Sequence, residues 1–310
     1  MHSTGPIRWS PTRLHAFRVC PFRAYQHYVR GLKDLPSPAA AFGSLVHAVI
    51  EDAIPAIQSG AWPRPHPGVI IPELLTQLEA AAYRLVGGYP SLGDPEADAV
   101  PPLAYRALDI VPWAYPLDVE AARELPLTPR DTLIGRIDLL VQAPDDLRVI
   151  DWKTGWRPQP AAVTEQVAAY ALLASGDAPH LPIDVTLRWI RTRAGTRHRL
   201  FEPAGIPALR TTLLARMTAI RAQLALVEQG VPVADAFPVR PSSRCAACPV
   251  AALCPAAAVY APTALASWTA PPHPLTPDAP APAAAVGEAL LATEAAATLA
   301  KAQVRSCRGR

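Results

Sequence analysis

Two strand-like runs joined by a short polar turn limit the folds open to this chain more than any other feature of its sequence. The runs are Asp131–Gln142 and Leu147–Asp151, and the letters APDD between them are typical of a hairpin connection. A third strand-like run, Leu117–Leu125, comes just before them. We therefore expect neighbouring strands at the centre of the fold, covered by the segments on both sides.

Helical patterns lie on both sides of these strands. After Ser10-Pro11, apolar residues follow at helical spacing as far as Gly31, and Pro21 is expected to break this segment into two pieces. Further helices are predicted at about 40–57, 162–175 and 207–230, with a second hairpin over about 183–201. This order of elements predicts an α/β fold, in which a mixed central sheet is flanked by helices.

Proline marks the segments that we place outside this core. Proline is most frequent in two stretches, 60–115 and 256–288, which hold 16 of the 37 Pro. The first stretch has one helical patch around Glu73–Val86, and we interpret it as an insertion that covers the core. The second stretch is typical of a flexible linker. We predict one domain over residues 1–255 with a Pro-rich insertion at about 60–115, and a linker and tail with a short helix over 256–310.

Each of the two adjacent strands is expected to end in a carboxylate. A hairpin would bring Asp138 of GRID and Asp151 of IDWK side by side. Because strand residues alternate faces, Asp151 and Lys153 project to one side, while Trp152 points away and leaves its carbonyl near the carboxylates. Two oxygen anions suit Mg²⁺ or Mn²⁺, and a metal-bound water beside a lysine suits phosphodiester hydrolysis. A D-x-K triplet alone is explained equally well as a surface ion pair.

Three further polar residues extend this pattern. The neutral imidazole of His47 would complete a metal shell, or His47 is an ordinary core or solvated histidine. Gln166 and Tyr170 share one face of the next predicted helix, where they suit contacts with a phosphate or a base. The plain alternative is helix polarity with a half-buried tyrosine. The occurrence of all these residues in this order favours the functional interpretation.

The cysteines form a second constellation. Five cysteines are present, and Cys245, Cys248 and Cys254 lie close together while Cys20 is far upstream. Four thiolates suit Zn²⁺ or a [4Fe–4S] cluster, and a lone cysteine with a triplet favours the cluster over zinc. Either group would fasten the C-terminal end of the domain to the N-terminal helix. Cys307 is interpreted as a free thiol.

Together these motifs resemble the RecB-type branch of the PD-(D/E)XK nucleases, including the iron–sulfur AddB nuclease domain and the CRISPR-associated adaptation nuclease. The matching motifs are SPTRL through CPFRAY, FGSLVH, GRID, DWKTG, Q-x-x-x-Y and the cysteine triplet, within about residues 8–256 and excluding the Pro-rich insertion. The resemblance implies a restriction-endonuclease-like core closed by a four-cysteine iron–sulfur cluster. By the same resemblance, the metal ligands would be His47, Asp138, Asp151 and the Trp152 carbonyl, the catalytic lysine Lys153, the DNA-strand contacts Gln166 and Tyr170, and the cluster ligands Cys20, Cys245, Cys248 and Cys254.

This resemblance implies a metal-dependent deoxyribonuclease, an exonuclease that acts on single strands or ends in DNA repair and recombination. A CRISPR adaptation nuclease is a close variant. A non-catalytic iron–sulfur DNA-binding clamp is an alternative, although the intact Asp138, Asp151 and Lys153 argue against it. A zinc-stabilised adaptor with a partner-recruiting tail is a third interpretation. The sequence has no P-loop signature, so a helicase or recombination partner would be a separate chain.

The charge of the chain limits how it would hold DNA. Its formal net charge is only +3, so nucleic-acid contact would depend on local basic clusters. The densest basic stretch spans 188–199, and phosphate contact and a solvated strand face explain it equally well. No run of about 18 apolar residues or apolar leader is visible, so we expect a cytoplasmic protein without a membrane partner. Other basic residues that could add to the surface are Arg18, Arg23 and Arg30.

Overall fold

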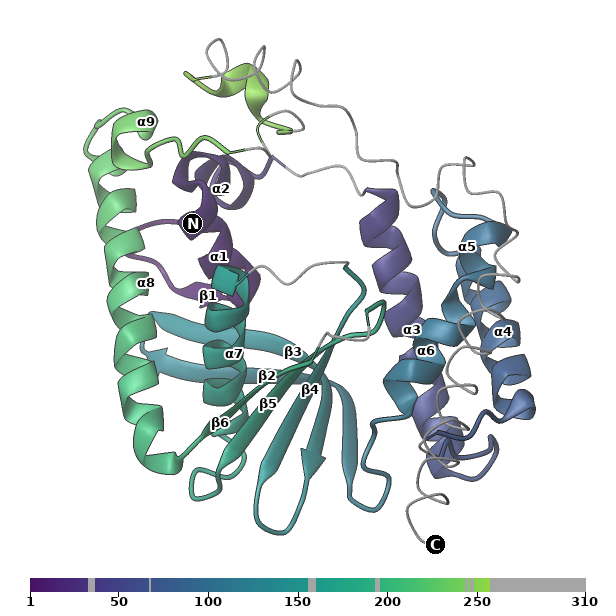
Figure 1. Cartoon of the computed structure of the whole chain (residues 1–310). Coiled ribbons are helices and arrows are strands. Elements are labelled where there is room, and N and C mark those ends of the chain that lie inside the picture. The colour runs from purple at the N-terminus through teal and green to yellow at the C-terminus, as the bar shows by residue number, and fades with distance from the viewer. Residues whose placement is uncertain are drawn as a thin grey trace, which may run out of the picture.

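A six-stranded mixed sheet forms the centre of the computed structural model, which describes residues 1–32, 37–66, 68–155, 160–192, 196–242, 245 and 248–256 (Figure 1). The strands follow the order β1-β3-β4-β5-β6, and β2 pairs with the other edge of β3. Their bounds are β1 Ile7–Trp9, β2 Leu117–Thr128, β3 Asp131–Gln142, β4 Leu147–Lys153, β5 Ile183–Trp189 and β6 Thr196–Phe201.

The long strand β3 has a gap along one of its edges. Strand β2 pairs with one edge of β3 over almost its whole length. On the other edge, β1 pairs with residues 131–133 and β4 pairs with residues 139–142. Residues 134–138 therefore lie between two strand partners. Backbone at such a gap is available for contacts with side chains, which makes this part of the sheet a natural place for a site.

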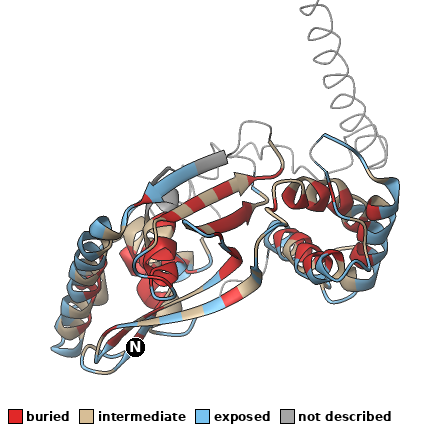
Figure 2. Cartoon of the chain, turned by 90° about the horizontal axis from the view of Figure 1, so that it is seen from below, coloured by how far each residue is buried: buried red, intermediate tan, exposed pale blue. Residues whose placement is uncertain are grey.

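Helices cover both faces of the sheet. Figure 1 shows α1, α7 and α8 together on one side and α3 to α6 together on the other. Each group has its own apolar core, which Figure 2 shows as two separate buried regions. The first group comprises α1 Pro11–Val19, α2 Pro21–Tyr28, α7 Pro160–Ala174, α8 Ile206–Glu228, α9 Val233–Ala236 and the short 3₁₀ turns Pro203–Gly205 and Ala251–Leu253. The second comprises α3 Pro38–Gln58, α4 Pro72–Val86, α5 Asp94–Asp98 and α6 Val100–Leu108.

The mixed sheet with flanking helices confirms the predicted α/β class. Pro21 ends one helix and starts the next, as expected, because α1 stops at Val19 and α2 begins at Pro21. The predicted central hairpin is present, and β4 continues two residues further than expected, to Lys153. Strand β1 was not predicted, since three residues are too few to show an alternating pattern.

The interpretation of residues 60–115 as a Pro-rich insertion with a single helix is wrong in one respect. Besides α4, the structure has α5 and α6 in this segment, and with α3 they share a core of their own. The prolines mislead because several of them stand in the first turn of a helix, where the missing N–H has no partner to lose. The predicted tail helix and the linker after residue 256 lie outside the described residues.

Helix α3 carries much of this second core. By length and composition it is the one described helix apolar enough to cross a membrane, with 44% of its most apolar window buried. It contacts α4 and α6, and its buried residues belong to the same apolar cluster as Leu139 and Trp152 of the sheet. A core helix of this kind passes the same test of length and composition, so the test adds no argument for a membrane.

Candidate active site

Asp138 and Asp151 lie where strands β3 and β4 separate. The last residue pair of their ladder is Leu139 with Ile150, so the two aspartates come directly after it. The Trp152 N–H donates to Asp138 Oδ2 at 2.8 Å and bridges the opening between the strands. The expectation that each strand ends in its carboxylate is wrong for both aspartates. Asp138 lies inside β3, which stays paired with β2 on its other edge, and β4 continues past Asp151 to Lys153.

Asp151 contacts three other residues of the motifs, which are Lys153, Gln166 and Tyr170. Its Oδ1 accepts a hydrogen bond from the Tyr170 hydroxyl at 2.8 Å and one from Gln166 Nε2 at 3.2 Å. Its Oδ2 lies 2.5 Å from Lys153 Nζ. Asp151 is only 2% exposed, and burial raises the pKa of its carboxyl while the Lys153 charge lowers it and the Asp138 charge raises it further.

His47 lies on the other side of this gap and meets Asp138. Its Nδ1 lies 3.4 Å from Asp138 Oδ2. Burial lowers the pKa of the imidazole, but the hydrogen bond to Asp138 and the charges of Asp138, Asp151 and Glu120 outweigh it and raise the pKa to about 9. Three carboxylates around one imidazole concentrate negative charge, which is the setting in which a protein binds a hard divalent cation.

Glu120 is a candidate ligand that the motifs did not reveal. One ligand atom each from His47, Glu120 and Asp138 lie within 4.8 Å of one another. The register of β2 on β3 places Glu120 opposite Asp138, since Val119 and Ala121 pair with the residues on either side of it. The only signal in the sequence was this strand position, which cannot be known before the register is known.

The backbone at Glu120 is also unusual. Its φ of 51° falls in the left-handed region, and Glu120 is the one non-glycine residue with positive φ in the described part of the chain. Arg136 Nε lies 2.5 Å from Glu120 Oε2, and Arg136 also reaches Glu51 of α3. Strained backbone conformations tend to persist at functional sites, where neighbouring contacts hold them. The conformation therefore supports a role for Glu120 in the site.

Two glycines allow the elements that carry these residues to approach one another. A Cβ at Gly43 of α3 would lie 2.8 Å from Thr154 Oγ1, and a Cβ at Gly135 of β3 would lie 2.5 Å from Leu173 Cδ1 of α7. Both distances are shorter than real contacts allow. Gly43 lets α3 bring His47 close to the end of β4, and Gly135 lets α7 lie against β3. The glycines in the FGSLVH and GRID motifs thus have a packing role.

The Trp152 side chain turns away from Asp151, as predicted. It is 2% exposed and packs in the core shared by α3 to α6. Its N–H is engaged by Asp138. The role of its carbonyl as a metal ligand stays a prediction.

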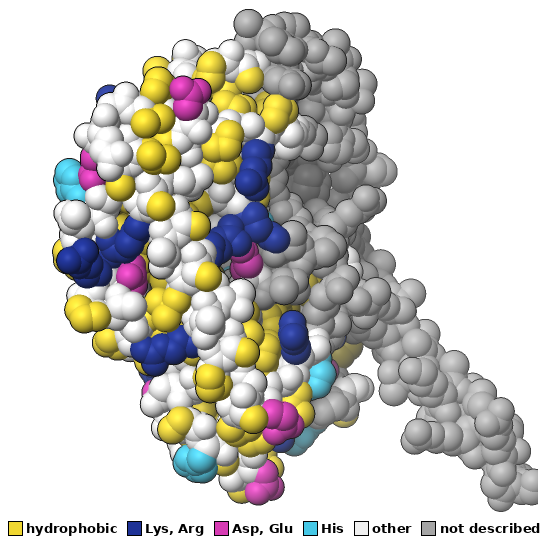
Figure 3. Space-filling model, turned by 90° about the vertical axis from the view of Figure 1, so that its left-hand side faces the viewer, with side chains coloured by type: hydrophobic (Ala, Val, Ile, Leu, Met, Phe, Trp, Pro, Cys, Tyr) yellow, Lys and Arg dark blue, Asp and Glu magenta, His cyan; other side chains and the backbone are white. Residues whose placement is uncertain are grey.

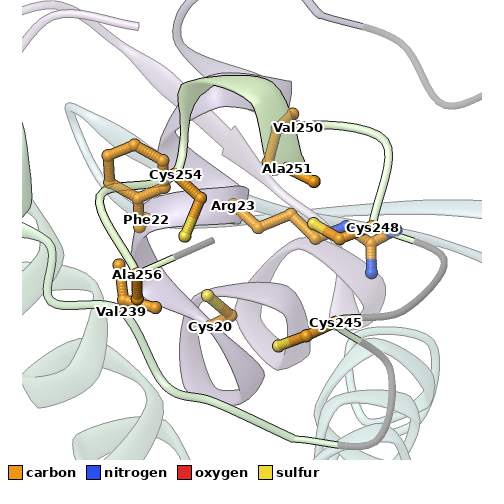
Figure 4. Close-up of a pocket in the computed structure, with 10 residues that line it drawn as sticks. All are labelled: Cys20, Phe22, Arg23, Val239, Cys245, Cys248, Val250, Ala251, Cys254 and Ala256. Carbon is orange, nitrogen blue, oxygen red and sulfur yellow. The ribbon is translucent and has the colours of Figure 1, made fainter. Parts of the chain in front are cut away.

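The four cysteines outside the tail line a single apolar cavity between the N-terminal helices and the last described segment. Cys20 stands at the junction of α1 and α2, and the other three follow α9. In Figure 4 their sulfur atoms turn toward a shared space. Burial raises the pKa of the Cys248 thiol, and Cys20 and Cys245 also raise it, while Arg23 lowers it. Segments from both ends of the domain therefore meet here, as the cysteine spacing had predicted.

The basic stretch near the second hairpin is not a uniform positive surface. The Arg191 guanidinium lies 4.5 Å from the centre of the Phe42 ring, and His198 pairs with Asp184 at 2.6 Å. Residues 193–195 lie outside the described residues. On the face shown in Figure 3, basic side chains are scattered between apolar ones and form no continuous patch. A nucleic acid that contacted this face would meet only small groups of basic residues.

Comparison with models of known protein families gives a match over most of the chain. The sequence model of the family described as the PD-(D/E)XK nuclease superfamily matches residues 8–255, which includes every described site residue named above. No curated protein matches the chain.

Proposed function

This chain belongs to the PD-(D/E)XK nuclease superfamily, and we propose that it is a deoxyribonuclease whose metal-dependent active site is built on Asp138 and Asp151. The superfamily supports a metal-dependent nuclease that acts on DNA. The observation that carries the assignment of residues is the convergence of His47, Asp138, Asp151 and Lys153 where β3 and β4 separate. No single element could supply this combination of charges.

The residues fit a divalent metal such as Mg²⁺ or Mn²⁺. We propose His47, Asp138, Asp151 and the Trp152 carbonyl as its ligands, and we add Glu120, whose carboxylate lies beside Asp138. Burial and the charge of Asp138 raise the pKa of Glu120, and the neighbouring carboxylates raise the pKa of His47 against the effect of its burial, so negative charge is concentrated at this site. When bound, the ion would polarise the scissile phosphate and lower the pKa of a water molecule.

Each remaining residue has a role that follows from its contacts. Lys153 is held against Asp151, where its ammonium group can orient the attacking water and stabilise charge on the phosphate. Tyr170 is 5% exposed and donates to Asp151 Oδ1, so it fixes that carboxylate. Gln166 donates to both Tyr170 and Asp151, and being partly exposed it is the better placed of the two to meet a DNA strand.

For the four cysteines we propose a [4Fe–4S] cluster. The cavity is lined by apolar residues and Arg23, and this supports a cofactor held by thiolates, because four such anions would be costly there unless a metal group supplied further positive charge. Zinc is the competing occupant. Iron and sulfide analysis of anaerobically purified protein separates the two, and stoichiometric zinc without iron would contradict the cluster. The cluster would act as a clamp between the two ends of the domain.

The finer function that we propose is an exonuclease acting on single strands or ends in DNA repair and recombination, with a helicase or recombination partner on another chain. A cytoplasmic location without a membrane partner belongs to the same proposal. The order of motifs along the sequence supports the exonuclease proposal. A CRISPR adaptation nuclease would share this chemistry. A non-catalytic clamp would bind DNA without cutting it.

The central experiment is cleavage of end-labelled single- and double-stranded DNA with Mg²⁺ or Mn²⁺. Asp151→Asn should abolish cleavage while DNA binding remains, because the substitution keeps the shape of the side chain and removes one metal-binding charge. The matched control is Asp145→Asn, which removes an exposed carboxylate from the turn between the same two strands. Equal cutting by the Asp151→Asn variant and the parent would reject the assigned site.

A further inference from the structure

A group of basic side chains surrounds Glu165, at the start of the described part of helix α7. Arg216 of α8 pairs with Glu165 Oε1. On the other oxygen, Oε2, Arg18 Nε lies at 3.3 Å and His15 Nδ1 at 3.6 Å. Arg240, in the segment that leads to the cysteine triplet, donates to the Arg18 carbonyl at 2.6 Å. We call Arg18, Arg216 and Arg240 with Glu165 the Glu165 cluster.

This cluster has more positive than negative charge. Three guanidinium groups converge, and within the described part of the chain Glu165 is the one carboxylate that pairs with any of them. Burial lowers the pKa of Arg216, and the charges of Arg18 and Arg240 lower it further, to about 10. Such crowding of like charges favours an additional anion.

The cluster is open to solvent and adjoins the active site. The side chains of Arg18 and Arg216 are 32% and 27% exposed, and Arg240 is exposed. Glu165 directly precedes Gln166, which donates to Asp151 Oδ1. Because neighbouring residues of a helix point in directions about 100° apart, one turn of α7 presents Gln166 to Asp151 and Glu165 to α1 and α8. A strand of DNA leaving the metal site across this turn would meet the cluster.

We propose that the Glu165 cluster is a phosphate-binding site for the DNA strand, with Arg18, Arg216 and Arg240 as the contacts and Glu165 as a counter-charge that the phosphate displaces. The planar guanidinium group binds a phosphate with two parallel hydrogen bonds, and it also binds a carboxylate in this way. The proposal rests on the proposed function, since it names where the DNA backbone lies relative to the metal site.

Because Glu165 and the phosphate compete for the same arginines, substitutions of the arginines and of Glu165 should change the DNA affinity in opposite directions. In the Asp151→Asn background, binding of a fluorescein-labelled single-stranded DNA of about 20 nucleotides is followed by anisotropy over a series of KCl concentrations. Arg240→Gln and Arg18→Gln should each weaken binding several-fold and reduce the slope of log K against log [salt] by about 0.7. Glu165→Gln should tighten binding, because it removes the competing anion.

The control for the arginine variants is Arg84→Gln, which removes an arginine that is also ion-paired, with Asp52, but lies on α4 in the other helical group. It should change neither affinity nor slope. Melting temperatures identify any variant that has lost its fold. Unchanged binding by both arginine variants would overturn the phosphate site, as would a loss of affinity in Glu165→Gln.

Failure of the site and failure of the proposed function remain distinguishable. If the parent cuts DNA and Asp151→Asn binds it, the function stands whatever the arginine variants show. If the parent cuts no DNA and the Asp151→Asn protein binds none at any salt concentration, the nuclease assignment and the phosphate site are both rejected.

Discussion

At the scale of single residues, the main feature of the site is a group of carboxylates whose negative charge has to be neutralised by neighbouring cations. Asp138, Asp151 and Glu120 gather around His47, and in the absence of a metal a proton on the imidazole and the Lys153 ammonium provide the opposing charge. Glu120 shows which site residues the sequence motifs could not predict. The motifs indicated the other four residues, whereas Glu120 becomes visible only when the β2–β3 register places it opposite Asp138.

A first prediction concerns Glu120→Gln. Burial raises the pKa of Glu120 and so does the Asp138 charge, which means that the folded state disfavours the ionised carboxylate. Neutralising the side chain should therefore raise the melting temperature of the metal-free protein, while Mn²⁺ affinity falls by about tenfold or more through loss of a ligand. Thermal melts with and without Mn²⁺ measure both effects. Unchanged Mn²⁺ affinity would remove Glu120 from the site.

A second prediction follows from the proton on His47. With a pKa of about 9, raised above its unfolded value, the imidazole is protonated at neutral pH and its pair with Asp138 is fully formed there. That contribution to stability is lost as the pH rises through 9. An imidazole binds a metal only in its neutral form, so metal binding should release this proton, and Mn²⁺ affinity should rise by about tenfold per pH unit below pH 9.

Calorimetric titration with Mn²⁺ in buffers of different ionisation enthalpy counts the released proton directly. His47→Gln should bind Mn²⁺ more weakly and with little dependence on pH above the range in which carboxylates titrate. A parent protein that releases no proton at pH 7 would show that His47 is not a ligand.

At the scale of elements, close approach decides whether the site residues meet. Helix α7 can bring Tyr170 to Asp151 only because β3 has no side chain at Gly135, where a Cβ would lie 2.5 Å from Leu173 Cδ1. The sequence predicted these elements from their apolar residues, which have helical spacing in α3 and form apolar runs in β3 and α7. It could not predict the contact between them, which depends on three-dimensional packing. The same holds for α5 and α6, where prolines at helix starts were taken for loop signals.

A third prediction tests this packing. Gly135→Ala should lower the free energy of unfolding by about 1–3 kcal/mol, because the buried Leu173 has to move aside in a close-packed core. It should also reduce cleavage, since Tyr170 on the same helix would shift from Asp151. Denaturant unfolding and the cleavage assay measure the two effects. Gly205→Ala is the matched control, as its Cβ would meet nothing within 4 Å, and a similar loss there would show that the effect of Gly135→Ala is not due to packing.

At the scale of the whole molecule, segments far apart in the sequence meet at two places, the candidate metal site and the cysteine cavity. The metal-site residues come from α3 on one side of the sheet, from β2, β3 and β4 within it, and from α7 on the other side. The four cysteines come from both ends of the described chain. Their spacing alone predicted that the ends meet, because four thiolates on one cofactor leave no other arrangement. Spacing could not predict the identity of the residues between the two sites, such as Glu165.

The last prediction asks whether the cysteines close the molecule. If their cofactor fastens α1 and α2 to the segment after α9, Cys248→Ala should lose iron and melt at a lower temperature, because the ends of the domain are no longer joined in the folded state. The active site has no element in common with the cysteine cavity, so the remaining folded protein should still cut DNA with Mn²⁺ at low temperature. Cys307→Ala, which changes the cysteine in the tail, should keep both iron and melting temperature. A Cys248→Ala protein that retains its iron and its stability would show that the four thiols do not share a cofactor.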